Sequence, residues 1–326
     1  MTYRVAIIGA GVMGNTHARH WGRVPGAEIV GALDLSLDAA QAVGPAFTDW
    51  NTLLSEAKPD IVDVCTPTPL HREYVERAAA AGKAIFVEKP LARTLEDCDA
   101  MLAAVERTGV PAMSGHVVRF FPEYAAAKRL VDAGGVGTPA AVRTARMGGM
   151  PTWSVWYADP AQSGGVALDL ILHDFDWLRW TFGPVSRVYT QGLMGRTELA
   201  GRLDYALVTL RFVAGAVAHI TGSWAHPTGF RTTFEIAGDG GLIEHDSARS
   251  APLTASLRGG EGGGSVAVPE SPLAEGEDPY YLELAAFVSA LENSEPPPVT
   301  LHDGREATRI GLAALESIET GKVVQL

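Results

Sequence analysis

The chain begins with a short apolar run that leads directly into a glycine-rich turn, Val5-Ala-Ile-Ile-Gly-Ala-Gly-Val-Met-Gly14. A polar, helix-compatible stretch follows as far as Trp21. A second apolar run, Glu28-Ile-Val-Gly-Ala-Leu33, then ends at Asp34. The order is therefore strand, glycine turn, helix and strand, with an acidic residue after the second strand. This order predicts the first crossover of a parallel α/β sheet.

The glycine turn has the Gly-x-Gly-x-x-Gly spacing that cradles the pyrophosphate of a dinucleotide. Gly9 permits the tight turn, Gly11 lets the backbone approach a phosphate, and Gly14 allows the helix to pack closely on the strand. The amides of Val12 and Met13 then point at the phosphates from the helix N-terminus, where the helix dipole favours negative charge. A tight turn without a ligand and a flavin site are the alternative interpretations.

Asp34 stands 20 residues after Gly14, at a place where a carboxylate can accept two hydrogen bonds from an adenosine ribose. A 2′-phosphate at this place would meet like charge. Residues 35–38 contain no arginine or lysine that could neutralise it. The sequence therefore favours NAD over NADP as the cofactor.

Two further apolar runs, Ile61–Cys65 and Ala84–Val87, continue the alternation with alanine-rich segments predicted to be helical at about 70–81 and 95–107. Apolar strands that alternate with helices are typical of a buried parallel sheet with helices on both faces. We therefore expect a doubly wound dinucleotide-binding domain over residues 1–118.

The pattern changes after about residue 118. From Val185 to about Val268 the chain shows strand-like runs in series without helices between them, which predicts an antiparallel sheet. Helices are predicted at about 122–133, 166–181, 279–292 and 303–320, and a further strand at 140–147. We therefore expect an α+β domain for substrate binding over residues 119–326.

The composition excludes several classes of protein. The 326 residues include 26 Lys and Arg against 38 Asp and Glu, a net charge of −12, which disfavours nucleic acid or an anionic membrane as a partner. No apolar stretch reaches the ~18 residues of a membrane-spanning helix, and the N-terminus lacks the features of a signal peptide. The two cysteines, Cys65 and Cys98, form no disulfide pattern. We expect a soluble, cytoplasmic protein.

A charged pair followed by proline, Glu88-Lys-Pro90, comes directly after an apolar strand. Ligands of open α/β sheets bind at the carboxyl ends of strands, so Lys89 is a candidate catalytic group. Lysine at its ordinary pKa of ~10.4 is a poor base at neutral pH, but burial or a nearby positive charge, such as oxidised nicotinamide, lowers this pKa. The alternative is a solvated Glu–Lys pair.

A second set of ionisable residues lies in a segment that is otherwise apolar. Asp169, His173 and Asp176 are spaced i, i+4 and i+7, so they share one face of the helix predicted at about 166–181. Apolar residues on both sides of this face indicate a helix that lines a cleft, and histidine titrates near ~6.5, which suits a base. A metal could use Asp and His one turn apart, but no third ligand group is evident, so we expect no metal ion.

Four motifs occur in order along the chain: Gly9-Ala-Gly-Val-Met-Gly-Asn-Thr-His17, Cys65-Thr-Pro-Thr-Pro-Leu-His71, Glu88-Lys-Pro90 and Gly164-Gly-Val-Ala-Leu-Asp-x-x-x-His-x-x-Asp176. Together they resemble the Gfo/Idh/MocA oxidoreductases over nearly the whole chain. The Glu-Lys-Pro motif is the most specific single piece. One departure is Val166, where the family often has a third glycine.

The resemblance implies a Rossmann domain followed by a domain with a large, mostly antiparallel, open-faced sheet. This sheet commonly packs against another subunit, so a homo-oligomer, dimer or tetramer, is expected. The resemblance also implies that Lys89 and His173 handle the substrate hydroxyl and that Asp169 orients them. Arg119 and Asp176 would contact the substrate.

The resemblance further implies that the dinucleotide is lined by residues beyond the glycine turn, namely Thr66, Pro67, His71, Glu88 and Lys89. The expected reaction is hydride transfer between NAD and a secondary hydroxyl of a sugar, an inositol or a related polyol. Two alternatives stay open. One is a glycosidase-like relative that uses transient oxidation by NAD, and the other is an NAD-binding regulator without catalytic activity.

Overall fold

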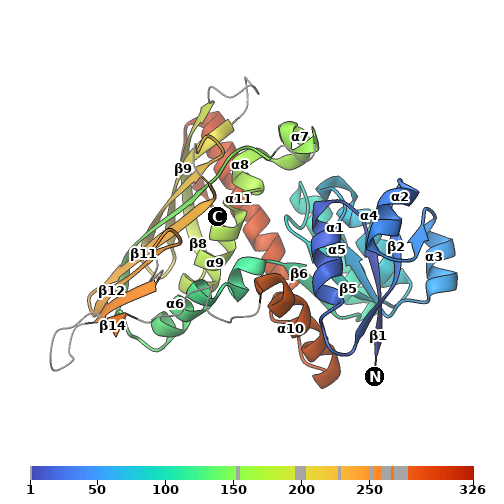
Figure 1. Ribbon diagram of the computed structural model, residues 1–326. Helices are drawn as coiled ribbons and strands as arrows, with labels where there is room; N and C mark the ends of the chain where they lie inside the picture. The colour runs from blue at the N-terminus through green and yellow to red at the C-terminus, as the bar shows by residue number, and fades with distance from the viewer. Residues whose placement is uncertain are drawn as a thin grey trace. The chain divides into compact units, whose positions relative to one another are not determined.

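The computed structural model describes residues 2–151, 155–194, 203–226, 229–249, 253–257, 266–267 and 278–326. The chain forms two compact units, each shown in Figure 1. The first comprises Met1–Val117 and Glu277–Thr308, and the second comprises Val118–Gly276 and Arg309–Leu326. The sequence pattern predicts a contiguous division at residue 118, whereas the contacts group a late segment of the chain with the first unit.

The first unit is built on a six-stranded sheet in the order β3-β2-β1-β4-β5-β6, with all neighbouring strands parallel. Its strands are β1 (Tyr3–Ile8), β2 (Ala27–Leu33), β3 (Ala46–Phe47), β4 (Ile61–Val64), β5 (Ala84–Glu88) and β6 (Ala112–Gly115). Its helices include α1 (Val12–Trp21), α2 (Leu37–Val43), α3 (Trp50–Ala57), η1 (Thr68–Leu70), α4 (His71–Ala80), α5 (Leu95–Thr108) and α10 (Pro279–Asn293). The strand order reverses between β1 and β4, which is where ligands bind in open α/β sheets.

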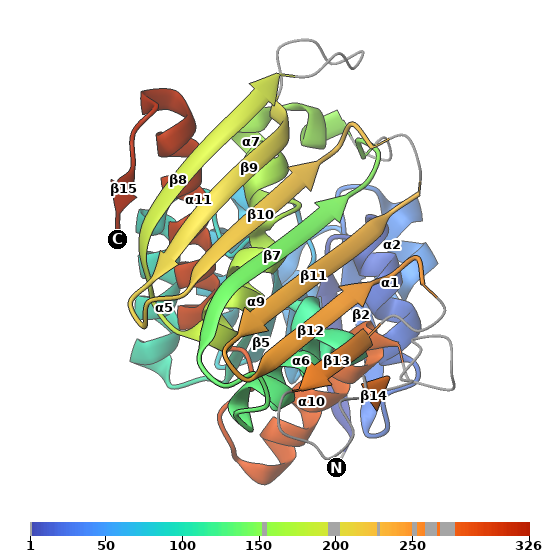
Figure 2. The same cartoon turned by 90° about the vertical axis from the view of Figure 1, so that its left-hand side faces the viewer.

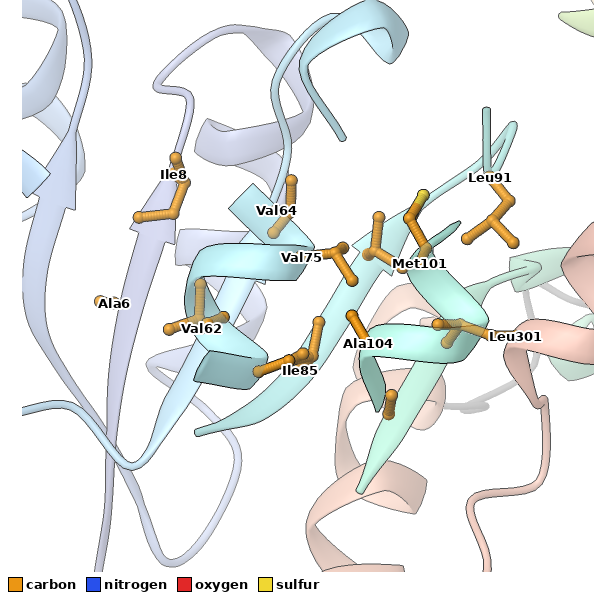
Figure 3. Close-up of a cluster of buried hydrophobic side chains, with 14 of the residues drawn as sticks. Ala6, Ile8, Val62, Val64, Val75, Ile85, Leu91, Met101, Ala104 and Leu301 are labelled. Carbon is orange, nitrogen blue, oxygen red and sulfur yellow. The ribbon is translucent and has the colours of Figure 1, made fainter. Parts of the chain in front are cut away.

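Helices cover both faces of this sheet. On one face, Ile85 of β5 belongs to a buried cluster with Val75 of α4 and Met101 of α5 (Figure 3). On the other, the ring of Phe86 meets the ring of Phe287 in α10, with centroids 5.9 Å apart. Successive side chains of a strand point to opposite faces, so these contacts confirm the predicted doubly wound sheet.

Aromatic contacts explain why α10 belongs to the first unit. Tyr280 stacks on His20 of α1 with ring centroids 6.1 Å apart, and Arg23 lies 5.1 Å from the ring centroid of Tyr281. Phe287 is fully buried. The contiguous division places this helix in the second domain, because spacing along the chain carries no information about which sheet these aromatic residues meet.

The second unit is built on a nine-stranded sheet in the order β14-β13-β12-β11-β7-β10-β9-β8-β15. Its strands are β7 (Pro139–Met147), β8 (Val185–Met194), β9 (Leu203–Phe212), β10 (Val217–Ser223), β11 (Arg231–Gly238), β12 (Gly241–Asp246), β13 (Leu253–Leu257), β14 (Val266–Ala267) and β15 (Val324–Gln325). Only the β7–β10 pair is parallel among the described strand pairs of this sheet. Figure 2 shows its broad face.

Helices cover one face of this second sheet (Figure 1). Alternate residues of β7, namely Val142, Thr144 and Arg146, are buried, whereas Ala141 and Arg143 are exposed. The helices and turns of this unit are η2 (Val117–Phe120), α6 (Pro122–Asp132), η3 (Val155–Ala158), α7 (Pro160–Ser163), α8 (Gly165–Leu168), α9 (Leu172–Phe182) and the later part of α11 (Leu301–Thr320). The predicted mostly antiparallel sheet with one covered face is confirmed.

The prediction of one continuous helix over 166–181 is wrong. The chain forms α8, a turn through residues 169–171, and then α9. The N–H of Ile171 donates to the oxygen of Val166, five residues back, which interrupts the α-helical ladder. Ile171 packs where a Cβ on Gly222 of β10 would lie 2.6 Å from its Cγ2, so the sheet favours the break. Asp169 therefore precedes the helix that carries His173.

None of the helices in the part of the chain that the structure describes has both the length and the apolar character needed to cross a membrane.

The close contact between α1 and β1 gives a test of the fold. A Cβ on Gly14 would lie 2.0 Å from the carbonyl oxygen of Gly9, so we expect Gly14→Ala to lower the free energy of unfolding by about 3 kcal/mol. Gly11→Ala is the matched control, because no described atom lies within 4 Å of its added Cβ. We expect a loss of at most about 1 kcal/mol there, since glycine is a somewhat better N-cap than alanine. Urea denaturation measures both, and equal losses would contradict the prediction.

Candidate active site

The glycine turn and Asp34 form one preorganised unit at the carboxyl edge of the first sheet. Gly9 has a φ of 95°, a conformation that side chains disfavour. Oδ2 of Asp34 accepts a hydrogen bond from the N–H of Ala10 at 2.8 Å, and Oδ1 accepts one from the N–H of Ser36 at 2.9 Å. The carboxylate is therefore held beside the turn. Each oxygen keeps a further lone pair that can accept a hydrogen bond.

The residues present fit a dinucleotide. Gly11 is exposed, and an added Cβ there would meet no described atom within 4 Å, so contacts within the described chain do not require glycine at this position. Gly9 lies directly against the start of the loop after β4, because a Cβ on it would be 2.8 Å from the backbone nitrogen of Thr66. In that loop, Oγ1 of Thr66 is buried and has no hydrogen-bond partner within the described residues. The open backbone of Gly11 and the hydroxyl of Thr66 thus belong to the two loops that follow β1 and β4, at the switch point of the sheet.

His71 supports this loop from inside. Its side chain is buried, with Nε2 2.9 Å from the oxygen of Thr66 and Nδ1 3.0 Å from the oxygen of Pro90. Burial lowers the pKa of His71, so the imidazole is neutral and donates to one of these carbonyls. The ring therefore links the loops that follow β4 and β5, while Pro67 before η1 is exposed.

Glu88 ends β5 and is almost fully buried. Its Oε2 accepts a hydrogen bond from the backbone N–H of Lys89 at 2.9 Å, and its Oε1 lies 3.1 Å from Nε2 of His17. Burial alone would raise the pKa of Glu88, but the hydrogen bond and charge of His17 outweigh it and hold that pKa below its usual range. The side chain of Lys89 is half-buried at the carboxyl end of the strand, the expected place for a ligand-facing group.

His17 and Asp63 extend this arrangement into the core. Nδ1 of His17 lies 2.9 Å from Oδ2 of Asp63, which also accepts a hydrogen bond from Nε1 of Trp21 at 2.7 Å. Burial lowers the pKa of His17, but Asp63 more than offsets this and raises it well above the ordinary value. The sequence pattern predicts no role for His17 or Asp63. The signal was a charged residue, Asp63, inside the apolar strand Ile61–Val64.

In the second unit, Arg119 and Asp176 form a buried two-point ion pair. Nε of Arg119 donates to Oδ2 of Asp176 at 2.7 Å and Nη2 donates to Oδ1 at 2.5 Å. The guanidinium also lies 5.2 Å from the ring centroid of Trp180. The structure thus joins two residues that the resemblance assigns separately to the substrate.

A second buried ion pair involves the same helix, α9. Nε of Arg146, on β7, donates to Oδ2 of Asp174 at 2.7 Å, and Nη2 lies 3.3 Å from the hydroxyl of Tyr124. Burial lowers the pKa of Arg146, but Asp174 outweighs this and raises it. Asp174 lies within the last sequence motif, whose pattern predicts no role for it, although a third carboxylate in an apolar segment is itself a sign of a special position.

Asp169 and His173 are the remaining candidate residues of this segment. Asp169 lies in the turn before α9 and is buried, with its N–H bonded to the oxygen of Gly165. His173 is half-buried in the first turn of α9. Lys89 belongs to the first unit, whereas Asp169 and His173 belong to the second.

Comparison with protein families assigns the chain. Residues 3–116 match the oxidoreductase family with an NAD-binding Rossmann fold, and residues 124–244 match the GFO/IDH/MocA C-terminal domain. The chain belongs to the GFO/IDH/MocA oxidoreductase family. The expected family is confirmed, and the first unit is an NAD-binding Rossmann domain.

Relatives that are named as dehydrogenases match almost the entire chain. Myo-inositol 2-dehydrogenase of Thermotoga maritima is 31% identical over 99% of this chain and 98% of its own length. The NAD(+)-dependent scyllo-inositol 2-dehydrogenase of Bacillus subtilis is 32% identical over 99% of this chain and 96% of its own. The structure of a levoglucosan dehydrogenase in complex with NADH superimposes with a TM-score of 0.91 at 25% identity, covering 100% of this chain and 99% of that one.

The Arg119–Asp176 pair gives a second test. Asp176→Asn removes the negative charge that binds the buried guanidinium of Arg119 at two points, so we expect the free energy of unfolding to fall by about 3–5 kcal/mol. Glu235→Gln is the matched control, since its pair with Arg143 on the neighbouring strand is accessible to solvent and its loss costs less than about 1 kcal/mol. Urea unfolding measures both, and a negligible effect of Asp176→Asn would refute the buried pair.

Proposed function

We propose that this oxidoreductase is an NAD-dependent dehydrogenase that acts on a secondary hydroxyl of a sugar, an inositol or a related polyol. The observation that carries the proposal is the open glycine turn beside an anchored Asp34, together with Lys89 at the carboxyl end of β5 of the same sheet. The names of the full-length relatives, two inositol dehydrogenases and a levoglucosan dehydrogenase, support this substrate class.

The proposed roles follow from the chemistry of each group. NAD, when bound, accepts the hydride. We assign the hydroxyl proton to Lys89 and His173, with Asp169 orienting them, because alcohol oxidation needs a base at the oxygen. A positive nicotinamide ring would lower the pKa of the Lys89 ammonium. Asp176, although paired with Arg119, keeps lone pairs that can accept a hydrogen bond from a substrate hydroxyl, and we assign both residues to substrate binding.

Asp34 supports a preference for NAD over NADP. Backbone donors hold its carboxylate in place, and the residue after it, Leu35, is almost fully exposed and cannot neutralise a phosphate. The proposal also includes a homo-oligomer formed through the open face of the second sheet, where Leu207 of β9 is exposed. A cytoplasmic location agrees with two free, buried cysteines, Cys65 and Cys98.

Activity measurements test the proposed reaction. Purified protein is incubated with NAD and a panel of inositols, aldoses, sugar acids and methyl glycosides, and reduced nicotinamide is followed by absorbance. We expect one polyol to give NADH, and Lys89→Ala and His173→Ala each to lower kcat about 100-fold or more. The controls are Lys83→Ala, at the amino end of the same strand, and His219→Ala, on an exposed position of β10.

The other outcomes have defined meanings. Free sugar released from a glycoside without net NADH would replace the proposal with the glycosidase-like reaction. Tight NAD binding that Lys89→Ala leaves unchanged, without turnover of any compound in the panel, would indicate an NAD-binding regulator without catalytic activity.

The cofactor preference has its own test. We expect Asp34→Ser combined with Leu35→Arg to lower kcat/KM for NAD by about 10- to 100-fold, because hydrogen bonds to a charged carboxylate are lost, and to raise kcat/KM for NADP. Leu35→Ala alone, with Asp34 intact, keeps the NAD preference. A wild-type enzyme that prefers NADP would refute the role given to Asp34.

A further inference from the structure

Two buried carboxylates face the two nitrogens of one buried imidazole in the first unit. Nδ1 of His17 lies 2.9 Å from Asp63, and Nε2 lies 3.1 Å from Glu88. The imidazole belongs to α1, the helix that begins at the glycine turn, and the carboxylates belong to β4 and β5. One side chain thus joins the cofactor-binding helix to the strand that ends at Lys89.

The hydrogen-bond partners of the two carboxylates indicate the charge of the His17 ring. Asp63 accepts hydrogen bonds from the indole N–H of Trp21 at 2.7 Å and from the thiol of Cys65 at 3.4 Å. Glu88 accepts one from the N–H of Lys89 at 2.9 Å. A carboxylate oxygen accepts hydrogen bonds, whereas a neutral imidazole carries a single N–H and can donate to only one of the two carboxylates. A ring that donates to both carboxylates carries a proton on each nitrogen and is an imidazolium.

A bound metal explains this geometry less well. Donor atoms of His17, Asp63 and Cys65 lie within 4.8 Å of one another, a spacing that a metal ion could bridge. Tetrahedral zinc, with bonds of about 2.0–2.2 Å to nitrogen and oxygen, would hold those two atoms about 3.3 Å apart. The 2.9 Å between His17 and Asp63 is the ordinary length of a hydrogen bond.

The positive charge of the His17 imidazolium offsets the negative charge of Glu88, the residue next to Lys89. With His17 protonated, the carboxylate of Glu88 is paired inside the unit. Without that pairing the negative charge of Glu88 would act more strongly on the adjacent ammonium of Lys89 and favour its protonated form, which cannot accept a proton. The titratable groups that face His17 are Asp63 and Cys65 around β4, Glu88 on β5, His20 on α1 and Tyr280 on α10.

We propose that His17 is a positioning residue of the active site: as an imidazolium it binds Glu88, fixes the backbone of Lys89 through that carboxylate, and keeps the Lys89 amine available as a base. The last part rests on the base role of Lys89 in the proposed function. The charge state of His17 does not depend on the proposed function, and it can be measured without turnover.

The first experiment is ¹⁵N NMR of the full-length protein labelled on histidine. The signal of His17 is assigned by its proximity to the indole N–H of Trp21, since both donate to the same oxygen of Asp63. We expect both ring nitrogens to be protonated at pH 7, above the ordinary histidine pKa of ~6.5. A ring with a single N–H at pH 7 would overturn the inference, whether or not a substrate has been found.

The second experiment measures the pH dependence of kcat. In His17→Gln the unpaired charge of Glu88 raises the pKa of Lys89, so the acid limb of the profile is expected to move up by about one pH unit or more, a roughly tenfold loss of kcat on that limb. His17→Gln with Glu88→Gln removes both charges and is expected to return the limb toward its wild-type position. This double variant also tests the inference if the single variant does not fold.

His20→Gln, one turn along α1, is the matched control and leaves the limb in place. A uniform loss of kcat at every pH in folded His17→Gln, with no recovery in the double variant, would mean that His17 only stabilises the fold, and would overturn the positioning role. Full activity of Lys89→Ala would instead overturn the proposed function, while the NMR result would still decide the charge of His17.

Discussion

The close approach of two glycines sets the geometry on which the first unit depends. The carbonyl oxygen of Gly9 occupies the space that a side chain on Gly14 would fill, so α1 starts directly against the end of β1. This contact exposes the backbone of Gly11 and places Ala10 where its N–H holds Asp34. The same helix, three residues after Gly14, carries His17 to the carboxylates of β4 and β5. One steric constraint thus positions both the dinucleotide turn and the charged cluster beneath Lys89.

Buried charged groups fix the positions of helices and strands in both units. In the first, an imidazolium joins a helix to two strands, and in the second Arg119 and Arg146 each bind a carboxylate of α9. A buried ion pair adds little net stability, because desolvation offsets the attraction, but removal of one partner is strongly unfavourable. Such pairs therefore select one position for each element. In α9 they orient Asp174 and Asp176 and so determine the rotation of the helix that carries His173.

Elements with a strong local signal could be predicted closely. The helices at 71–80, 95–108 and 279–293, and the strand at 139–147, lie within a residue or two of their expected bounds. The break in the helix expected over 166–181 could not be predicted, because it depends on the packing of Ile171 against Gly222, in a strand some fifty residues later. Apolar periodicity is the same for one continuous helix and for two short ones, so the sequence contains no local sign of the turn.

The sequence by itself determined the parallel and antiparallel halves, the glycine turn with its acid, and the list of residues able to do chemistry. These depend on backbone freedom, side-chain period and residue type, all of which are local. The tertiary structure decided the partners: Arg119 for Asp176, Arg146 for Asp174, His17 for Asp63 and Glu88, and the first unit for α10. Pairing joins residues that are far apart in the sequence, such as His20 and Tyr280. Which of the available charges and rings come within contact distance is set by how the sheets and helices pack, and that information is not contained in any single stretch of the chain.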